Sequence, residues 1–154
     1  SNELSRMNLT VFNASFSGET SSGGLSRLPG LLQRHQPNFV LIILGGNDGL
    51  RGLPLKELSN NLDNIFKVVR EAKAIPLYAG VDLPPNFGKP FTEAFRKVQN
   101  NAAKRNNVTY LKFLLEPIYK DRSNFMPDGI HPNLNAQEKI GRYVLNWLVN
   151  VLSQ

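Results

Sequence analysis

Hydrophobic positions along this chain follow two spacings, one typical of buried strands and one typical of amphipathic helices. The unbroken apolar run at residues 39–44 is rich in β-branched side chains, which predicts a strand buried on both faces. Shorter apolar runs at 9–13, 75–81 and 108–113 predict three more strands. A helical pattern follows each strand, so the strand–helix order occurs four times.

Four segments repeat their apolar residues every three to four positions, which predicts helices with one buried face. The first three cover about residues 21–35, 54–74 and 91–105, with Pro54 suited to a first turn. In the last helix the apolar face contains Ile140, Val144, Trp147, Leu148 and Val151. Parallel strands need crossovers, and these helices supply them. The sequence therefore predicts one α/β domain over residues 1–154, with helices on both faces of a parallel sheet.

Composition narrows the class of protein. A chain of 154 residues can bury a full core as one domain. No apolar run reaches the roughly 18 residues of a membrane-spanning helix, so no integral membrane segment is expected. The lack of cysteine excludes disulfides and a thiolate nucleophile or metal site. The net charge of +6 is scattered over helix faces without a nucleic-acid-binding motif, so nucleic acid is not an expected partner.

Chemically distinctive turns follow each predicted strand. They lie at residues 15–20, 45–48, 82–90 and 128–131. In open parallel sheets, ligands bind outside the carboxyl ends of the strands. We therefore expect the functional site on the rim that these four turns share.

The last of these turns pairs an acid with a histidine. Asp128 precedes His131 by three residues, just before the final helix. A carboxylate beside an imidazole fixes its tautomer and stabilises the imidazolium that forms on proton uptake. The spacing favours a catalytic base at His131 oriented by Asp128, and a structural or surface histidine is the alternative. His35 has no acidic neighbour and is expected to be solvated.

Two other turns contain possible hydrogen-bond donors to an oxyanion. Asn47 lies between glycines at a strand end, where its neutral amide can face a developing negative charge. Gly18 permits close backbone approach, so its N–H is a second possible donor. Each residue also suits an ordinary turn, and spacing alone leaves that alternative open. Asp48 is interpreted as holding its turn, because a second carboxylate would oppose an oxyanion.

Three sequence blocks in this order are together much more specific than any one of them. They are Asn13-Ala-Ser-Phe-Ser-Gly-Glu-Thr-Ser21, Gly45-Gly-Asn-Asp-Gly-Leu-Arg-Gly52 and Asp128-Gly-Ile-His-Pro132. They resemble the second, third and fifth blocks of the SGNH (GDSL) hydrolase superfamily. Within that superfamily the chain resembles the bacterial thioesterase I, lysophospholipase L1 and arylesterase group.

The resemblance implies a flavodoxin-like three-layer α/β/α sandwich and a role for each matched residue. Gly18 would be the backbone donor and Asn47 the side-chain donor of the oxyanion hole. His131 would be the general base, with Asp128 as its orienting acid. Substrates would be carboxylic esters, acyl thioesters or lysophospholipids, hydrolysed without a metal or other cofactor in the periplasm or after secretion.

The loop at residues 82–90 is our candidate for the wall that contacts the acyl chain. Leu83 and Phe87 are its apolar side chains. The alternative is a proline-rich connection with no role in binding.

The chain departs from the family at the nucleophile. No Gly-Asp-Ser block occurs in it, and the serines between residues 15 and 22 belong to the second block and a helix start. We therefore expect an N-terminally incomplete domain that lacks a central first strand and its catalytic serine. That segment would precede these residues or form a separate chain. These 154 residues alone are expected to be inactive and poorly folded, with bare strand edges.

Two other functions remain open on the sequence. The first is a non-catalytic SGNH-like relative that binds a lipid or glycan without a nucleophile. The second is a flavodoxin-like phosphate or nucleotide binder. Against the second, Gly45-Gly46 is not followed by the Lys-Ser/Thr pair of a phosphate-binding loop.

Overall fold

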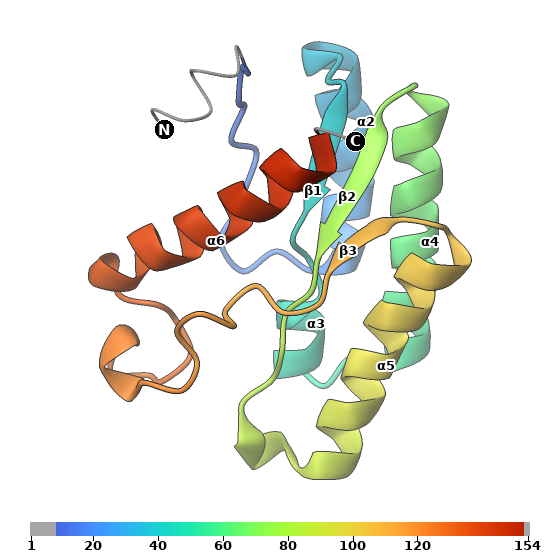
Figure 1. Ribbon diagram of the computed structural model, residues 1–154. Helices are drawn as coiled ribbons and strands as arrows, with labels where there is room; N and C mark the ends of the chain where they lie inside the picture. Colours follow the sequence, from blue (N-terminus) through green and yellow to red (C-terminus); the bar gives the residue numbers. More distant parts are fainter. Residues whose placement is uncertain (1–8, 153–154) are drawn as a thin grey trace.

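A three-stranded parallel sheet forms the centre of the computed structural model, which describes residues 9–152 (Figure 1). The strands are β1 (Phe39–Ile42), β2 (Ile75–Ala79) and β3 (Thr109–Leu111), in the order β1-β2-β3. Leu41 of β1 pairs with Leu77 of β2, and Leu77 pairs with Thr109 of β3. The predicted α/β class with a parallel sheet is confirmed.

Helices follow each strand, close to the predicted positions. The long ones are α2 (Ser21–His35), α4 (Leu55–Glu71), α5 (Lys89–Arg105) and α6 (Leu134–Leu152). Three short ones are α3 (Gly46–Leu50), η1 (Pro85–Phe87) and η2 (Arg122–Asn124). The residues predicted as a turn after β1 thus form a five-residue helix.

The core lies mainly around α4. Leu62, Phe66 and Val69 of this helix are fully buried. They follow the predicted helical spacing, so one stripe of α4 faces inward. This helix contacts α2, α5 and strand β2. Burial of this stripe fixes the helices against the sheet and so fixes where the loops begin.

A buried polar network fixes the carboxyl ends of β1 and β2. The Tyr78 hydroxyl lies 3.1 Å from the Leu44 carbonyl oxygen and 2.9 Å from Oε1 of Gln99. Gln99 is fully buried, accepts from the N–H of Val81 (3.0 Å) and donates to its carbonyl oxygen (2.9 Å). Burial raises the pKa of Tyr78 well above its ordinary value, so the hydroxyl stays neutral. The network anchors the strand ends from which the site loops extend.

The strand predicted at residues 9–13 is not formed. Val11 and Phe12 are exposed, and the Phe12 ring lies 4.6 Å from the ring of His35. His35 is therefore half-covered by Phe12 rather than fully solvated. A strand needs a neighbour to pair its N–H and C=O groups, and within residues 9–152 no strand lies beside this segment. The sheet thus has three strands in the described residues, not the predicted four.

Strand β1 also differs from the prediction of burial on both faces. Phe39 is 39% exposed, and of its four residues only Ile42 is buried. Strand β1 is at the edge of the sheet, and across residues 9–152 its outer side pairs with no other strand. The apolar side chains of β1 are therefore only partly buried by the described residues.

Helix α6 lies on the opposite side of strands β1 and β2 from α4 (Figure 1). Its predicted apolar face is half-buried at Ile140, Val144 and Trp147, and Ala136 is the one buried residue of its described length. Helices thus flank the sheet on both sides, with closer packing on the α4 side. None of the described helices has the length and apolarity needed to cross a membrane.

Candidate active site

The turn after β1 places Asn47 at the second position of α3. Gly45 precedes this helix with a φ of 111°, a backbone conformation that side chains rarely adopt. A Cβ at this position would also lie 3.2 Å from Cδ1 of Leu58. Glycine therefore permits both the sharp turn and its close packing on α4, and Asn47 follows at the rim.

Two hydrogen bonds join this turn to the turn before α2. The Asn47 amide nitrogen donates to the Glu19 carbonyl oxygen at 2.9 Å. The Arg51 guanidinium donates to the Gly18 carbonyl oxygen, also at 2.9 Å. Gly18 itself has a φ of 75°, which again favours glycine. The structure therefore brings Gly18 and Asn47, predicted from separate blocks, to one place on the rim.

Both predicted oxyanion donors have an N–H to offer. Among residues 9–152, no acceptor bonds the backbone N–H of Gly18. The Asn47 amide has two hydrogens, and one of them is used by Glu19. Gly18 is exposed and Asn47 is half-buried, so a substrate oxygen can reach this part of the surface.

Asp128 and His131 form a preassembled pair. Nδ1 of His131 lies 2.8 Å from Oδ2 of Asp128. The other carboxylate oxygen accepts from the backbone N–H groups of Ile130 (2.8 Å) and His131 (3.0 Å). These hydrogen bonds, led by the His131 backbone N–H, lower the pKa of Asp128 to about 2. Asp128 is therefore an anion at neutral pH, which keeps the proton on Nδ1 and leaves Nε2 free to accept one.

The loop around this pair is held by its backbone and by two asparagines. The Met126 N–H donates to the His131 carbonyl oxygen at 2.7 Å. Asn133 donates to the Ser123 carbonyl oxygen at 2.6 Å, and its own side-chain oxygen caps α6 at Ala136 (3.1 Å). Asn124 is buried below the loop and binds Lys139 at 3.0 Å. Sequence reasoning missed both asparagines, although an asparagine just before a helix is a capping signal.

The loop at residues 82–90 places its two apolar side chains differently. Leu83 is 6% exposed and packs beneath α3, where a Cβ at Gly49 would meet its Cδ2 at 2.6 Å. Phe87 is half-buried, with its ring 6.4 Å from that of Phe91. Leu83 thus packs against α3, and Phe87 has a larger exposed fraction than Leu83 that a ligand could contact. The role of both in substrate binding stays a prediction.

The two halves of the site are not joined by direct bonds. In the described part of the chain, no hydrogen bond or ion pair links Asp128 or His131 to Gly18 or Asn47, and no serine bonds His131. Ser21 is fully buried and donates its hydroxyl to Asp48 at 2.5 Å, so it is not available as a nucleophile. No cluster of metal-ligating side chains occurs in residues 9–152.

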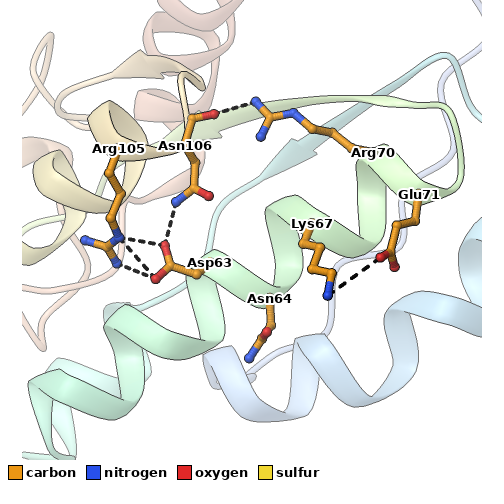
Figure 2. A pocket seen from close by; sticks show the side chains of 7 residues that line it. All are labelled: Asp63, Asn64, Lys67, Arg70, Glu71, Arg105 and Asn106. Carbon is orange, nitrogen blue, oxygen red and sulfur yellow. Dashed lines mark hydrogen bonds and ion pairs between the residues drawn. The ribbon is translucent and has the colours of Figure 1, made fainter.

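A separate surface hollow of about 660 Å³ lies between α4 and the end of α5 (Figure 2). Its charged lining is already paired, as in the bonds from Arg105 and Asn106 to Asp63. The hollow borders the helix ends that precede β2 and β3, so it lies at the amino ends of the strands. It is therefore remote from the rim that holds the predicted site residues.

Comparison with known proteins identifies the family. A sequence profile of the GDSL-like Lipase/Acylhydrolase family matches residues 2–139. Thioesterase 1/protease 1/lysophospholipase L1 of Escherichia coli is 42% identical over 143 residues, covering 93% of this chain and 67% of that protein. An arylesterase of Vibrio mimicus is 38% identical, covering 94% and 72%.

The fold agrees with this assignment. The crystal structure of a psychrotrophic esterase, EstA from Pseudoalteromonas, superposes with a TM-score of 0.93 at 32% identity. The match covers 99% of this chain and 85% of that one. Sequence profile, relatives and fold agree, and the chain belongs to the GDSL-like lipase/acylhydrolase family of ester hydrolases.

Proposed function

We propose that the protein hydrolyses carboxylic esters, acyl thioesters or lysophospholipids through an acyl-enzyme. The observation that carries this proposal is the preassembled pair of His131 and ionised Asp128, 2.8 Å apart. Gly18 and Asn47, whose turns are joined by hydrogen bonds, would supply the oxyanion donors. Names of relatives support the substrate class, since they include a thioesterase, a lysophospholipase and an arylesterase.

In the proposed mechanism, His131 is the general base. Its Nε2 takes the proton of a serine hydroxyl as the serine oxygen bonds to the acyl carbon. The carbonyl oxygen becomes an oxyanion, which accepts hydrogen bonds from the Gly18 N–H and the Asn47 amide. The tetrahedral species collapses, and the imidazolium returns its proton to the leaving alcohol or thiol. Water then repeats the sequence on the acyl-enzyme and releases the acid.

The nucleophile in this proposal is a serine outside these 154 residues. Two observations support its assignment to another segment. Ser21 is committed to Asp48, and His131 bonds no serine within residues 9–152. A segment that supplies it, in the same chain or as a separate one, would find the outer edge of β1, which no strand within residues 9–152 pairs.

Substrate contacts and location complete the proposal. We place the acyl chain along the loop of residues 82–90, with Phe87 as the contacting side chain and Leu83 packed beneath α3. By family, a periplasmic or secreted location is proposed. No metal or other cofactor takes part.

A fluorophosphonate probe tests the nucleophile and the base together. The protein as its gene encodes it is labelled, digested and analysed by peptide mass spectrometry. A phosphonate bonded to the serine mimics the tetrahedral anion, and the EstA structure is described as inhibited by monoethylphosphonate. We expect one labelled serine, and slower labelling in His131→Ala. No hydrolysis of p-nitrophenyl esters and no label at any serine would overturn the proposal.

A further inference from the structure

We propose that Asp48 is a positioning residue that, with Ser21 and Asn61, sets the distance between the two oxyanion donors. This inference rests on the proposed function, because it assigns these residues to the oxyanion hole formed by Gly18 and Asn47. The family blocks contain Asp48 and Ser21 but Asn61 lies outside them, on α4.

A chain of hydrogen bonds through Ser21 connects the three helices α2, α3 and α4. Asp48 is 3% exposed and Ser21 is fully buried. Oδ2 of Asp48 accepts the backbone N–H of Ser21 at 2.8 Å, and Oδ1 accepts its hydroxyl at 2.5 Å. The Asn61 amide donates to Oγ of Ser21 at 2.9 Å. The N–H and the hydroxyl hydrogen of Ser21 thus bond to Asp48 of α3, and its hydroxyl oxygen accepts a bond from Asn61 of α4.

This set lies directly behind the two donors. Asp48 follows Asn47 in sequence, and Ser21 comes three residues after Gly18. The Asn47 amide donates to the Glu19 carbonyl oxygen at 2.9 Å, so the two turns are joined by this bond as well as by the bonds between Asp48 and Ser21. A shift of Asp48 relative to Ser21 therefore moves the Asn47 turn relative to the Gly18 turn. Buried hydrogen bonds are stronger than exposed ones. The buried bonds between Asp48 and Ser21 therefore hold the two turns together more rigidly than the exposed Arg51–Gly18 hydrogen bond does.

The chemistry of Ser21 explains why a carboxylate occupies this position. Its N–H and its hydroxyl both donate toward residue 48, and only a carboxylate has an acceptor at each oxygen. An asparagine would turn an NH₂ group toward one of these donors. A buried carboxylate is costly to desolvate, and here two hydrogen bonds and the positive end of α2 offset that cost.

The test uses the Asp48→Asn substitution in the full protein as its gene encodes it, alone and combined with Asn47→Ala. Alone, it should lower kcat about 10- to 100-fold, because small misplacements of reacting groups have effects of that size. KM should change less than about 3-fold, since the donors act in the transition state. With Asn47 already replaced, the loss from Asp48→Asn should shrink to about 3-fold or less.

Asp63→Asn is the matched control. Asp63 also accepts hydrogen bonds from two side chains, Arg105 and Asn106, but at the far hollow of Figure 2. We expect it to lower the thermal midpoint without changing kcat. If Asp48→Asn does not fold, Ser21→Ala takes its place, because it removes the two hydrogen bonds of the hydroxyl, to Asp48 and from Asn61, and keeps the N–H contact to Asp48.

The outcomes separate this inference from the proposed function. An unmutated protein that hydrolyses no ester overturns both. An active protein in which Asp48→Asn, or Ser21→Ala in its place, lowers kcat equally with and without Asn47 overturns the positioning role alone. An equal loss of kcat in Asp63→Asn would also overturn the positioning role, since it would show that kcat falls because the protein as a whole is less stable.

Discussion

His131 and Asp128 are three residues apart in one loop, and their side chains meet at 2.8 Å between Nδ1 and Oδ2. The same carboxylate also accepts two backbone N–H groups of its own turn. One acid thus shapes the loop and orients the imidazole. The hydrogen bonds between these two residues lie within one turn, so the geometry of the pair is local, whereas its distance from the oxyanion donors depends on the fold.

His131→Ala should abolish most of the proposed activity. We expect kcat for a p-nitrophenyl ester to fall by roughly 10³-fold or more with a modest change in KM, because the base acts in the transition state. His35→Ala is the control, since His35 contacts Phe12 and not the rim. Near wild-type turnover in His131→Ala would remove His131 from the mechanism.

Asp128→Asn should act through the tautomer of His131. The asparagine oxygen can still accept the two backbone N–H groups, but its amide would face Nδ1 as a donor. The imidazole would then hold its proton on Nε2 and lose its capacity as a base. We expect kcat to fall by about 10⁴-fold, as for triad acids in general, with the fold intact by circular dichroism. A loss below about tenfold would argue against an orienting role.

The loop around Asp128 should loosen only in strong acid. Hydrogen bonds lower the pKa of this carboxyl from 3.8 to about 2, so the folded loop favours the anion. Its stabilising contribution is therefore fully present above pH 3.8 and is lost as the pH falls through about 2. We expect the amide NMR signals of Ile130 and His131 to shift with a midpoint near pH 2. In Asp128→Asn the same signals should not titrate there.

Asn47→Ala tests the side-chain donor. If its amide stabilises the oxyanion, kcat should fall about 10²- to 10³-fold, or ~3–4 kcal/mol of barrier. The Glu19 carbonyl oxygen also loses its partner, so thermal unfolding is measured alongside kinetics. A variant that unfolds at room temperature would instead assign Asn47 to turn formation.

The 154 residues alone should show no esterase activity. His131 would have only water to deprotonate, and no described serine bonds it. Addition of a strand that carries Gly-Asp-Ser, in cis or as a peptide, should restore fluorophosphonate labelling on the added serine. A fluorophosphonate adduct on Ser15, Ser17 or another of these residues would show that the nucleophile is present in this sequence.

Local sequence patterns determined most elements of this protein. The helix from Leu55 to Glu71 follows its apolar spacing to within a few residues of the prediction, because that spacing places Leu62, Phe66 and Val69 on one buried stripe. The Asp128–His131 contact was likewise predictable, since three residues of one turn bring the two side chains together. The three sequence blocks also indicate the family without reference to the fold.

Tertiary structure decided what depends on partners far away in the chain. The segment at residues 9–13 has a strand-like sequence but no neighbouring strand in the described residues, and pairing, not propensity, makes a strand. The sequence does not show that Leu83 is buried beneath α3, and its predicted contact with the acyl chain stays a prediction. Ser21 of α2 and Asp48 of α3 are 27 residues apart, and the packing of both helices against α4 brings them together. Long-range hydrogen bonds carry no local signature in the sequence, so the fold alone shows which polar residues are joined.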